Sequence, residues 1–204
     1  MFVDFYLSGN VIMNIGDGVS ARYYNPGDKV PANYQLLLTF KDESFLVFTV
    51  AMYGFISAYP DAVIDNKYYT ISRESISPLS DAYTEAEFEK LFAFAKKTLT
   101  AKALLATEQR IPGVGNGVTQ DILFNAGIHP KQKVIDLSDG QKGVLFKSLK
   151  DTLMAMTSGR GRDTQTDLYG NEGGYKTILS SKTWKNPCPR CGSVIVKEAY
   201  LGGS

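Results

Sequence analysis

The sequence predicts an α+β protein, in which a partial antiparallel β-sandwich is followed by a helical domain. Residues 2–59 alternate apolar and polar positions with a period of two, whereas residues 84–159 repeat apolar positions with the period of a helix. The 204 residues are 44% hydrophobic, which is enough to bury a core in one or two domains. No apolar run approaches the ~20 residues that span a bilayer, so we expect no membrane helix.

Aromatic and β-branched residues dominate the first 60 positions, which favours short antiparallel strands. Asp17-Gly18 predicts a tight hairpin turn, and the run from Asn25 to Asp28 predicts a loop. We attribute the aromatic density to core packing, with base stacking as the alternative. The predicted strands are Phe2–Leu7, Val11–Ile15, Ala21–Tyr24, Tyr34–Phe40, Phe45–Val50 and Tyr53–Tyr59.

Capping residues mark four helices after a connector at residues 75–80. Ser, Thr and Asn side chains accept from the free amides of a first helical turn, and glycine ends a helix in the left-handed conformation. The predicted helices run over 85–97 after Thr84 with Glu87, from Thr100 to near Ile111, from Asn116 to Ala126 before Gly127, and from Ser138 with Gln141 to Gly159.

The last segment, residues 160–204, is glycine-rich, basic and weakly periodic. Residues 131–204 carry a net charge of +5, whereas residues 1–130 carry −4. Such asymmetry is consistent with an electrostatic footprint for nucleic acid, and a solvated basic surface is the alternative. The sequence pattern predicts three parts: a partial sandwich lobe at 1–75, a helical domain at 76–159, and a basic loop with one half of a zinc knuckle at 160–204.

The two cysteines, Cys188 and Cys191, are spaced like one half of a zinc knuckle and are too few for a disulfide framework. A strand is expected to follow at residues 193–197. A structural zinc needs four ligands. The single histidine, His129, is interpreted as a structural residue at a helix end, so we do not expect the ligands of this chain to complete a zinc site.

The run from Ile111 to Gly117 places a glycine-rich turn directly before a helix. Glycines let backbone amides converge, and the helix N-terminus adds partial positive charge, so an anion such as phosphate can bind there. The alternative is a tight turn between helices, in which Asn116 serves only as an N-cap.

Residues 104–116, continuing through 121–130, resemble the helix–two-turns–helix segment of the formamidopyrimidine-DNA glycosylase and endonuclease VIII family. The sequence Cys188-Pro-Arg-Cys191-Gly resembles the first half of the zinc finger of that family, and the β-rich start is compatible with its N-terminal sandwich. The resemblance implies a helix–two-turns–helix domain, a partial zinc-finger hairpin, and base-excision repair as a DNA glycosylase and AP lyase. The partner would be duplex DNA with a damaged base or an abasic site, from which the base is flipped out.

In the family, the asparagine and the turn amides of this motif hold DNA phosphates. That role would fall here on Asn116, with Gly113 and Gly115 forming the turn. Lys102 occupies the position of a lysine often found in the helix before the motif, and we expect it to contact phosphate, with a solvated surface lysine as the alternative. Three further cations lie where the family has a flexible stretch near the extruded base, with a plain basic loop as the alternative: Arg160, Arg162 and Lys176.

The chain departs from the family at both ends. The family cleaves with an N-terminal proline amine and an adjacent glutamate, whereas this chain starts Met1-Phe2-Val3-Asp4, so no catalytic residue is assigned. We therefore expect a truncated relative that binds DNA without cleaving it, and zinc only in a longer parent. A non-enzymatic RNA-binding module with the same glycine turn, and a structural protein without nucleic acid, are the alternatives. The start lacks a signal peptide, which favours a cytoplasmic protein, expected as a monomer.

Overall fold

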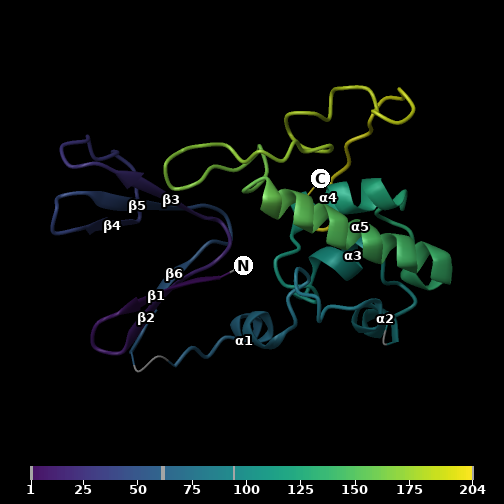
Figure 1. The fold of residues 1–204 in the computed structure, drawn as a ribbon, viewed down its shortest axis with the longest axis horizontal. Coiled ribbons are helices and arrows are strands. Elements are labelled where there is room, and N and C mark those ends of the chain that lie inside the picture. Colours follow the sequence, from purple (N-terminus) through teal and green to yellow (C-terminus); the bar gives the residue numbers. More distant parts are fainter. Residues whose placement is uncertain (1, 61–62, 94, 204) are drawn as a thin grey trace. The chain divides into compact units, whose positions relative to one another are not determined.

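The computed structural model describes residues 2–60, 63–93 and 95–203. The chain forms two compact units: unit 1 holds residues 1–73 and 165–172, and unit 2 holds residues 74–164 and 173–204 (Figure 1). Two small antiparallel sheets and several helices confirm the α+β class. The three-part division predicted from the sequence stays a prediction. Within the described ranges, no helix combines the length and the apolar character that crossing a bilayer requires.

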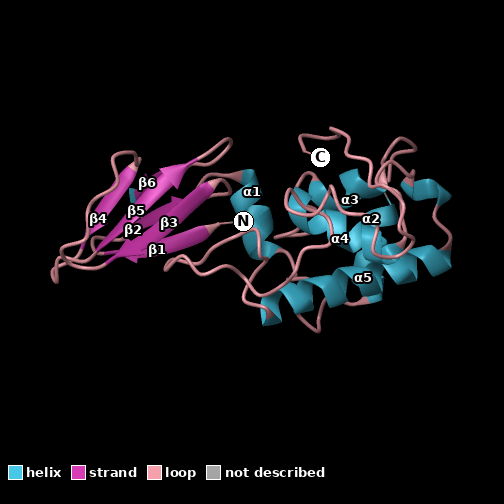
Figure 2. Cartoon of the chain, turned by 90° about the horizontal axis from the view of Figure 1, so that it is seen from above, coloured by secondary structure: helices cyan, strands magenta, loops and turns pink. Residues whose placement is uncertain are grey.

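Unit 1 contains two three-stranded antiparallel sheets, shown as magenta arrows in Figure 2. Its small core centres on Met13, Ile15 and Phe48. On β2 burial is continuous from Ile12 to Ile15, so side chains on both faces of this strand are covered, whereas on β5 the exposed Thr49 follows the buried Phe48. The first sheet has the order β1 (Val3–Leu7), β2 (Val11–Ile15) and β6 (Ile56–Tyr59), and the second has β3 (Val19–Tyr24), β5 (Phe45–Val50) and β4 (Leu36–Thr39).

The hairpin predicted at Asp17-Gly18 is wrong. Strand β2 pairs with β1 and β6, whereas β3 pairs with β5, so this turn carries the chain from one sheet to the other. A glycine is needed there because Gly18 has φ +83° and a Cβ would lie 2.9 Å from the backbone nitrogen of Gly54. The loop predicted from Asn25 to Asp28 is confirmed, and it contains a turn in which the Asp28 amide donates to the Asn25 carbonyl over 3.1 Å.

Helix α1 (Lys67–Glu74) lies in a stretch to which the sequence analysis assigned no element. Asn66 starts it by accepting from the Tyr68 amide over 2.9 Å. Its side chains then reach Asp4 on β1, which accepts from the Tyr69 hydroxyl over 2.8 Å and lies 3.7 Å from the Arg73 guanidinium. None of the helix residues is buried, and besides these polar contacts the Tyr69 ring meets the Phe2 ring edge to face, with centroids 5.5 Å apart.

Unit 2 packs its helices around one apolar core that includes Phe88, Ile122, Leu145 and Leu149. The predicted caps are confirmed at Thr100, at Ser138 with Gln141, and at Gly127, which is left-handed with φ +67°. The helices are α2 (Glu85–Ala93), α3 (Ala101–Ala106), α4 (Asn116–Ala126) and α5 (Asp139–Ser158), with a 3-10 turn at Val134–Asp136. The helix predicted over 85–97 is therefore shorter, with Phe94 outside the described residues.

Asn116 was predicted as the N-cap of α4, and this is wrong by one position. Gly115 is the N-cap, with extended backbone at φ −100°, and Asn116 is the first helical residue. The Gly115 carbonyl accepts from the Thr119 amide over 3.0 Å, which begins the helix without a side-chain cap. The Asn116 side chain is therefore not used to cap the helix.

Candidate nucleic-acid interface

Two consecutive turns connect α3 to α4 and fix the direction in which α4 starts. The first uses left-handed backbone at Glu108 and Gln109, and the second uses Gly113 with φ +83°. The buried side chains of Ile111 and Val114 anchor the connection in the core of unit 2. Apart from Gly113 and its two chain neighbours, no described residue has an atom within 4 Å of the place where a Cβ on Gly113 would stand, so this part of the turn borders open space.

The structure brings Lys102 of α3 and Asn116 of α4 to the same cavity, which has a volume of about 720 Å³. The rest of its lining comes from α4, from the turn at residues 127–131, and from the segment 179–200. Lys102 is only 3% exposed, and burial lowers the pKa of its ammonium group. A cation held on the wall of a cavity attracts an anion strongly, because few waters screen it.

Lys102 and Asn116 both contact the last described residues of the chain. The Lys102 ammonium donates to the Tyr200 carbonyl over 2.6 Å. Asn116 lies beneath Gly203, where an added Cβ would stand 2.5 Å from the Asn116 Cγ. Among the described residues, no group within hydrogen-bond distance donates to the buried Oδ1 of Asn116.

Asp121, one turn further along α4, is fully buried and holds the following loop against the helix. Its carboxylate accepts from the Tyr175 hydroxyl over 3.1 Å, the Ile178 amide over 3.0 Å and the Leu179 amide over 2.8 Å. Burial and the adjacent carboxylate raise the pKa of Tyr175. Asp121 therefore positions residues 175–179, which continue into the wall of the cavity.

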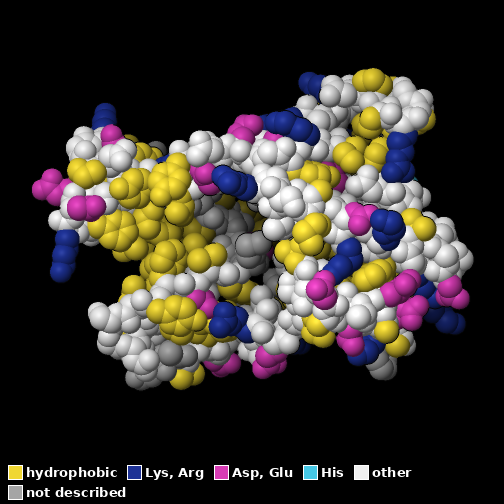
Figure 3. All heavy atoms as spheres, viewed as in Figure 1, with side chains coloured by type: hydrophobic (Ala, Val, Ile, Leu, Met, Phe, Trp, Pro, Cys, Tyr) yellow, Lys and Arg dark blue, Asp and Glu magenta, His cyan; other side chains and the backbone are white. Residues whose placement is uncertain are grey.

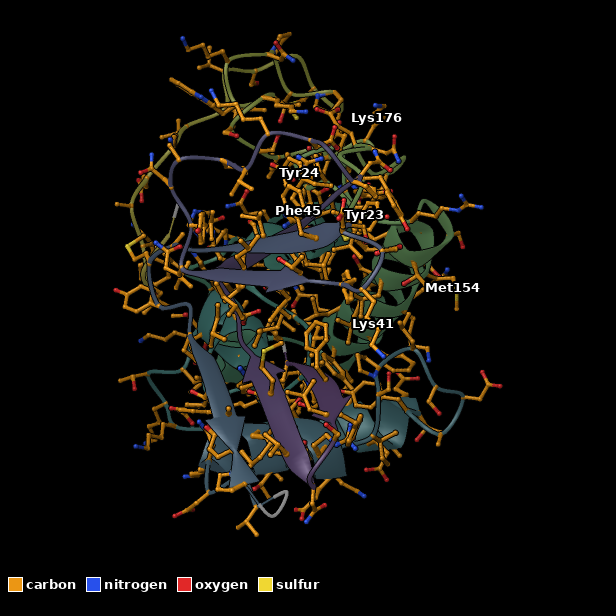
Figure 4. All side chains as sticks on the ribbon, turned by 90° about the vertical axis from the view of Figure 1, so that its left-hand side faces the viewer. Tyr23, Tyr24, Lys41, Phe45, Met154 and Lys176 are labelled. Carbon is orange, nitrogen blue, oxygen red and sulfur yellow. The ribbon has the colours of Figure 1, made fainter. Side chains whose placement is uncertain are left out.

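The three loop cations predicted from the sequence have different surroundings in unit 2, although Arg162 forms an isolated bridge to Tyr175, the neighbour of Lys176. Arg162 lies against the first turn of α4, where a Cβ on Gly117 would overlap its Nη1. Lys176 is 80% exposed and lies 4.0 Å from the carboxylate of Asp163, and it is labelled in Figure 4. Arg160 is exposed at the end of α5, with left-handed backbone at φ 55°.

The segment 165–172 lies against strand β3 in unit 1. Asp167 closes it by accepting from the amides of Tyr169 and Asn171, both over 2.9 Å. The Leu168 carbonyl accepts from the Tyr23 amide over 2.8 Å, and the rings of Tyr23 and Tyr169 meet edge to face. These contacts fasten the segment to β3.

Aromatic side chains of unit 1 serve both its core and its surface. Phe45 and Phe48 are buried, as the core-packing interpretation predicts, and Phe45 stacks on Tyr24 with ring centroids 4.9 Å apart (Figure 4). Other apolar residues of the unit are exposed, including Tyr6 and Tyr53. Figure 3 shows apolar side chains gathered on the visible face of this unit.

Cys188 and Cys191 lie on one tight turn, in which the Gly192 amide donates to the Cys188 carbonyl over 2.8 Å. Hydrogen bonds from Ser193 and from Cys188 lower the pKa of the Cys191 thiol. Arg190 fastens the turn to α4 by donating to the Asn125 carbonyl over 2.9 Å. The two thiols are therefore fixed near each other at the edge of unit 2.

These residues alone do not fit a structural zinc site. In the part of the chain that the structure describes, no group of three or more His, Cys, Asp or Glu side chains could hold a metal. His129 accepts from the Lys131 amide over 3.2 Å, as expected of a structural residue. The strand expected at 193–197 is wrong: Val194 forms one isolated bridge to Pro187 and is 88% exposed, because no neighbouring strand pairs with it.

Sequence reasoning missed Tyr200, Lys131 and Trp184, which line the same cavity as Lys102 and Asn116. Lys131 directly follows residues 121–130, which resemble the family motif, so its position in the sequence could have indicated that it lies beside this site. Tyr200 gave none, because it lies 98 positions from Lys102.

No family model matches the chain, but curated relatives do. Formamidopyrimidine-DNA glycosylase of Mycoplasma mobile is 28% identical over 214 residues, covering 99% of this chain and 74% of the relative. The enzyme of the same name from Streptococcus agalactiae is 28% identical over 196 residues, covering 93% and 70%. That of Carboxydothermus hydrogenoformans is 29% identical over 130 residues, covering 62% of this chain and 49% of the relative. The chain thus spans about half to three quarters of the length of these relatives.

Solved structures show the same fold. The Fpg (MutM) protein of Lactococcus lactis, in a complex with a DNA containing N7-benzyl-Fapy-dG, has a TM-score of 0.79 at 20% identity and covers 98% of this chain and 74% of that one. MutM (Fpg) of Thermus thermophilus has a TM-score of 0.74 at 23% identity, with 98% and 75% coverage. The resemblance to the formamidopyrimidine-DNA glycosylase family is confirmed.

Proposed function

We propose that this chain binds duplex DNA, as the DNA-holding part of a base-excision repair glycosylase of the formamidopyrimidine-DNA glycosylase type. The observation that carries the proposal is the meeting of Lys102 and Asn116 at one cavity beside the start of α4. The fold likeness supports it, because several of the solved relatives are complexes with DNA that contains a damaged base or an abasic site.

Each of these groups suits a phosphate of the DNA backbone. The ammonium of Lys102 and the amide of Asn116 can donate hydrogen bonds to phosphate oxygens, and the partial positive charge at the N-terminus of α4 favours an anion beside them. Contacts of this kind fix the position of a duplex and carry no base information. Selection of a lesion therefore depends on other parts of the protein.

The proposal includes a finer architecture. We interpret α3, its two turns and α4 as a helix–two-turns–helix motif, and the Cys188–Cys191 turn as the first ligand pair of a zinc-finger hairpin. Since this chain has only two cysteines, two ligands of such a site are missing from it, and no step of the proposal depends on zinc.

An electrophoretic shift experiment tests the proposal with three probes of equal length: a duplex with an abasic site, the intact duplex and a single-stranded RNA. We expect the tightest binding to the abasic duplex, because a missing base lowers the energy of opening the stack. All three probes are compared at one salt concentration, since phosphate contacts weaken steeply with salt. A preference for RNA, or no binding to either duplex at low salt, contradicts the proposal.

We also expect that borohydride traps no covalent adduct between this 204-residue chain and abasic DNA. Trapping requires an imine between an amine nucleophile and the open sugar, and the 204 residues contain no Pro-Glu pair like the one implied by the family resemblance. A full-length formamidopyrimidine-DNA glycosylase serves as the positive control on the same probe. A trapped band with this chain shows that another amine, identifiable by peptide mapping, acts as the nucleophile.

A further inference from the structure

We propose that Arg162 is a positioning residue for the phosphate-binding start of α4: its guanidinium, packed against Gly117, offsets the negative charge of the two carboxylates buried beside it, Asp121 and Asp163. This inference rests on the proposed function and adds to it a residue that acts through α4 and not by contact with the DNA. It is carried by the packing of Arg162 on the first turn of α4 and by the burial of both carboxylates.

The first observation is that Gly117 makes room for the guanidinium. Gly117 is the second residue of α4, and its backbone is not left-handed, so the helix itself does not require a glycine there. A Cβ at this position would overlap Nη1 of Arg162 and stand 3.0 Å from Cζ. Glycine inside a helix is less stable than alanine. The glycine therefore lowers helix stability and allows the guanidinium to lie against the helix.

The second observation is the charge around the guanidinium. Asp121 is 0% exposed and Asp163 is 9% exposed. Burial lowers the pKa of Arg162, and the charges of these two carboxylates act on it in the opposite direction. Lys176, 4.0 Å from the Asp163 carboxylate, is largely exposed, so water screens its charge. Buried charges need a partner, and the half-buried Arg162 supplies one.

The third observation is that the backbone carrying Arg162 is fixed. Arg162 forms a bridge with Tyr175, and the Asp163 amide donates to the Tyr175 carbonyl over 2.9 Å. The Asp163 carboxylate accepts from the amide and the hydroxyl of Thr177, over 3.2 Å and 2.9 Å. The Tyr175 hydroxyl in turn donates to Asp121 on α4 over 3.1 Å. These bonds hold the loop against α4, so little freedom is lost when the guanidinium packs on the helix.

The distance along α4 makes this compensation matter to a phosphate. Asp121 lies about 7.5 Å along the axis from Asn116, at a rise of about 1.5 Å per residue. This is shorter than the screening length of about 10 Å at about 0.1 M salt, and burial weakens the screening further. An uncompensated carboxylate at this distance opposes a phosphate at Lys102 and Asn116. Arg162 is not among the described residues that line their cavity, so it acts on the phosphate through its charge.

Gly117→Ala tests the inference, because the added methyl group displaces the guanidinium without changing the net charge of the chain. We expect this variant to bind an abasic duplex about tenfold more weakly than the parent chain at fixed salt, the order expected for one uncompensated charge in a partly screened medium. Gly140→Ala is the matched control. Gly140 is the exposed second residue of α5, and its Cβ would make an ordinary contact at 3.9 Å. Its affinity is expected to equal that of the parent.

A double-mutant cycle with Arg162→Gln shows whether the methyl group acts through Arg162. We expect Arg162→Gln to weaken binding by a similar factor with an unchanged salt slope, and Gly117→Ala to add no further loss in that background. A slope smaller by about 0.9 indicates a direct phosphate contact and overturns the positioning role. A further loss on adding Gly117→Ala overturns it as well, because the methyl group then acts on the DNA itself.

Rescue by a second substitution separates charge compensation from a purely structural role. Asp163→Asn removes one carboxylate charge and keeps an acceptor for Thr177, so we expect it to restore tighter binding when combined with Arg162→Gln. Asp136→Asn, at an exposed aspartate, removes the same charge elsewhere and is expected to restore nothing. Equal binding by the two combinations overturns the compensation.

Urea unfolding, followed by Trp184 fluorescence, gives a readout without DNA. We expect Gly117→Ala to lower the midpoint in the parent chain and to raise it in Arg162→Gln, because alanine stabilises a helix once no guanidinium is displaced. A higher midpoint for Gly117→Ala in the parent chain overturns the packing of Arg162 on the helix. The expected reversal of sign, together with no binding of any duplex by the parent chain, overturns the proposed function, while the packing of Arg162 on Gly117 stands.

Discussion

Replacing Asp121 with alanine is expected to lower the free energy of unfolding of the chain by about 3 kcal/mol or more, since three donors lose their acceptor at once and each unsatisfied donor costs about 1–3 kcal/mol when buried. The donors are the Tyr175 hydroxyl and the amides of Ile178 and Leu179. Asp121 is 0% exposed, so its truncation leaves a small space lined by these three donors inside unit 2. The loss therefore acts on the packing between α4 and the segment that follows α5.

Urea unfolding measures this effect, with the fluorescence of the single tryptophan, Trp184, as the probe. The midpoint for Asp121→Ala is expected well below that of the parent chain, whereas Asp136→Ala, at an exposed aspartate, is expected to match the parent. Equal midpoints for the two variants show that the buried carboxylate does not hold the loop. Tyr175→Phe, which removes one of the three donors together with its hydrogen bond, is expected to fall between them.

The helix ends that depend on a few neighbouring residues were predicted correctly from the sequence. Ser138 with Gln141 and Gly127 act through their own backbone and side-chain geometry, so a short window contains the whole signal. Helix α1 has no such signal in its apolar pattern, because none of its residues is buried. Its attachment depends on Asp4, more than 60 positions earlier in the sequence.

Strand pairing and the candidate site also depend on contacts between distant residues, which a short window of sequence does not contain. The dipeptide Asp17-Gly18 fits a hairpin locally, but the partners of β2 and β3 lie in different sheets, and only the tertiary structure determines that. Asn116 could be proposed because it lies at one recognisable turn, and Lys102 because the family resemblance places a lysine in the helix before that turn. Tyr200, which covers them, could not, since no local pattern reports a contact across 98 positions.

The salt dependence of DNA binding is expected to distinguish the two proposed phosphate ligands. Lys102→Met removes a charge and keeps an apolar stem of similar length, so the slope of log affinity against log salt is expected to fall in magnitude by about 0.9, the value for one phosphate contact on duplex DNA. Asn116→Ala removes a neutral donor. We expect it to lower affinity by about tenfold, as for one hydrogen bond to a charged partner, with the slope unchanged.

The slope is the decisive measurement for Lys102, because the substitution also removes the hydrogen bond to the Tyr200 carbonyl, so that affinity alone mixes two effects. Freeing an uncharged carbonyl releases no counterion, so it leaves the slope alone. Titrations from low to moderate salt with one abasic duplex give both quantities, and Lys133→Met controls for the loss of an exposed positive charge. Slopes that are identical for the parent chain and Lys102→Met exclude a phosphate contact at Lys102. A changed slope for Asn116→Ala contradicts the expectation for that residue, because the loss of a neutral side chain removes no charge.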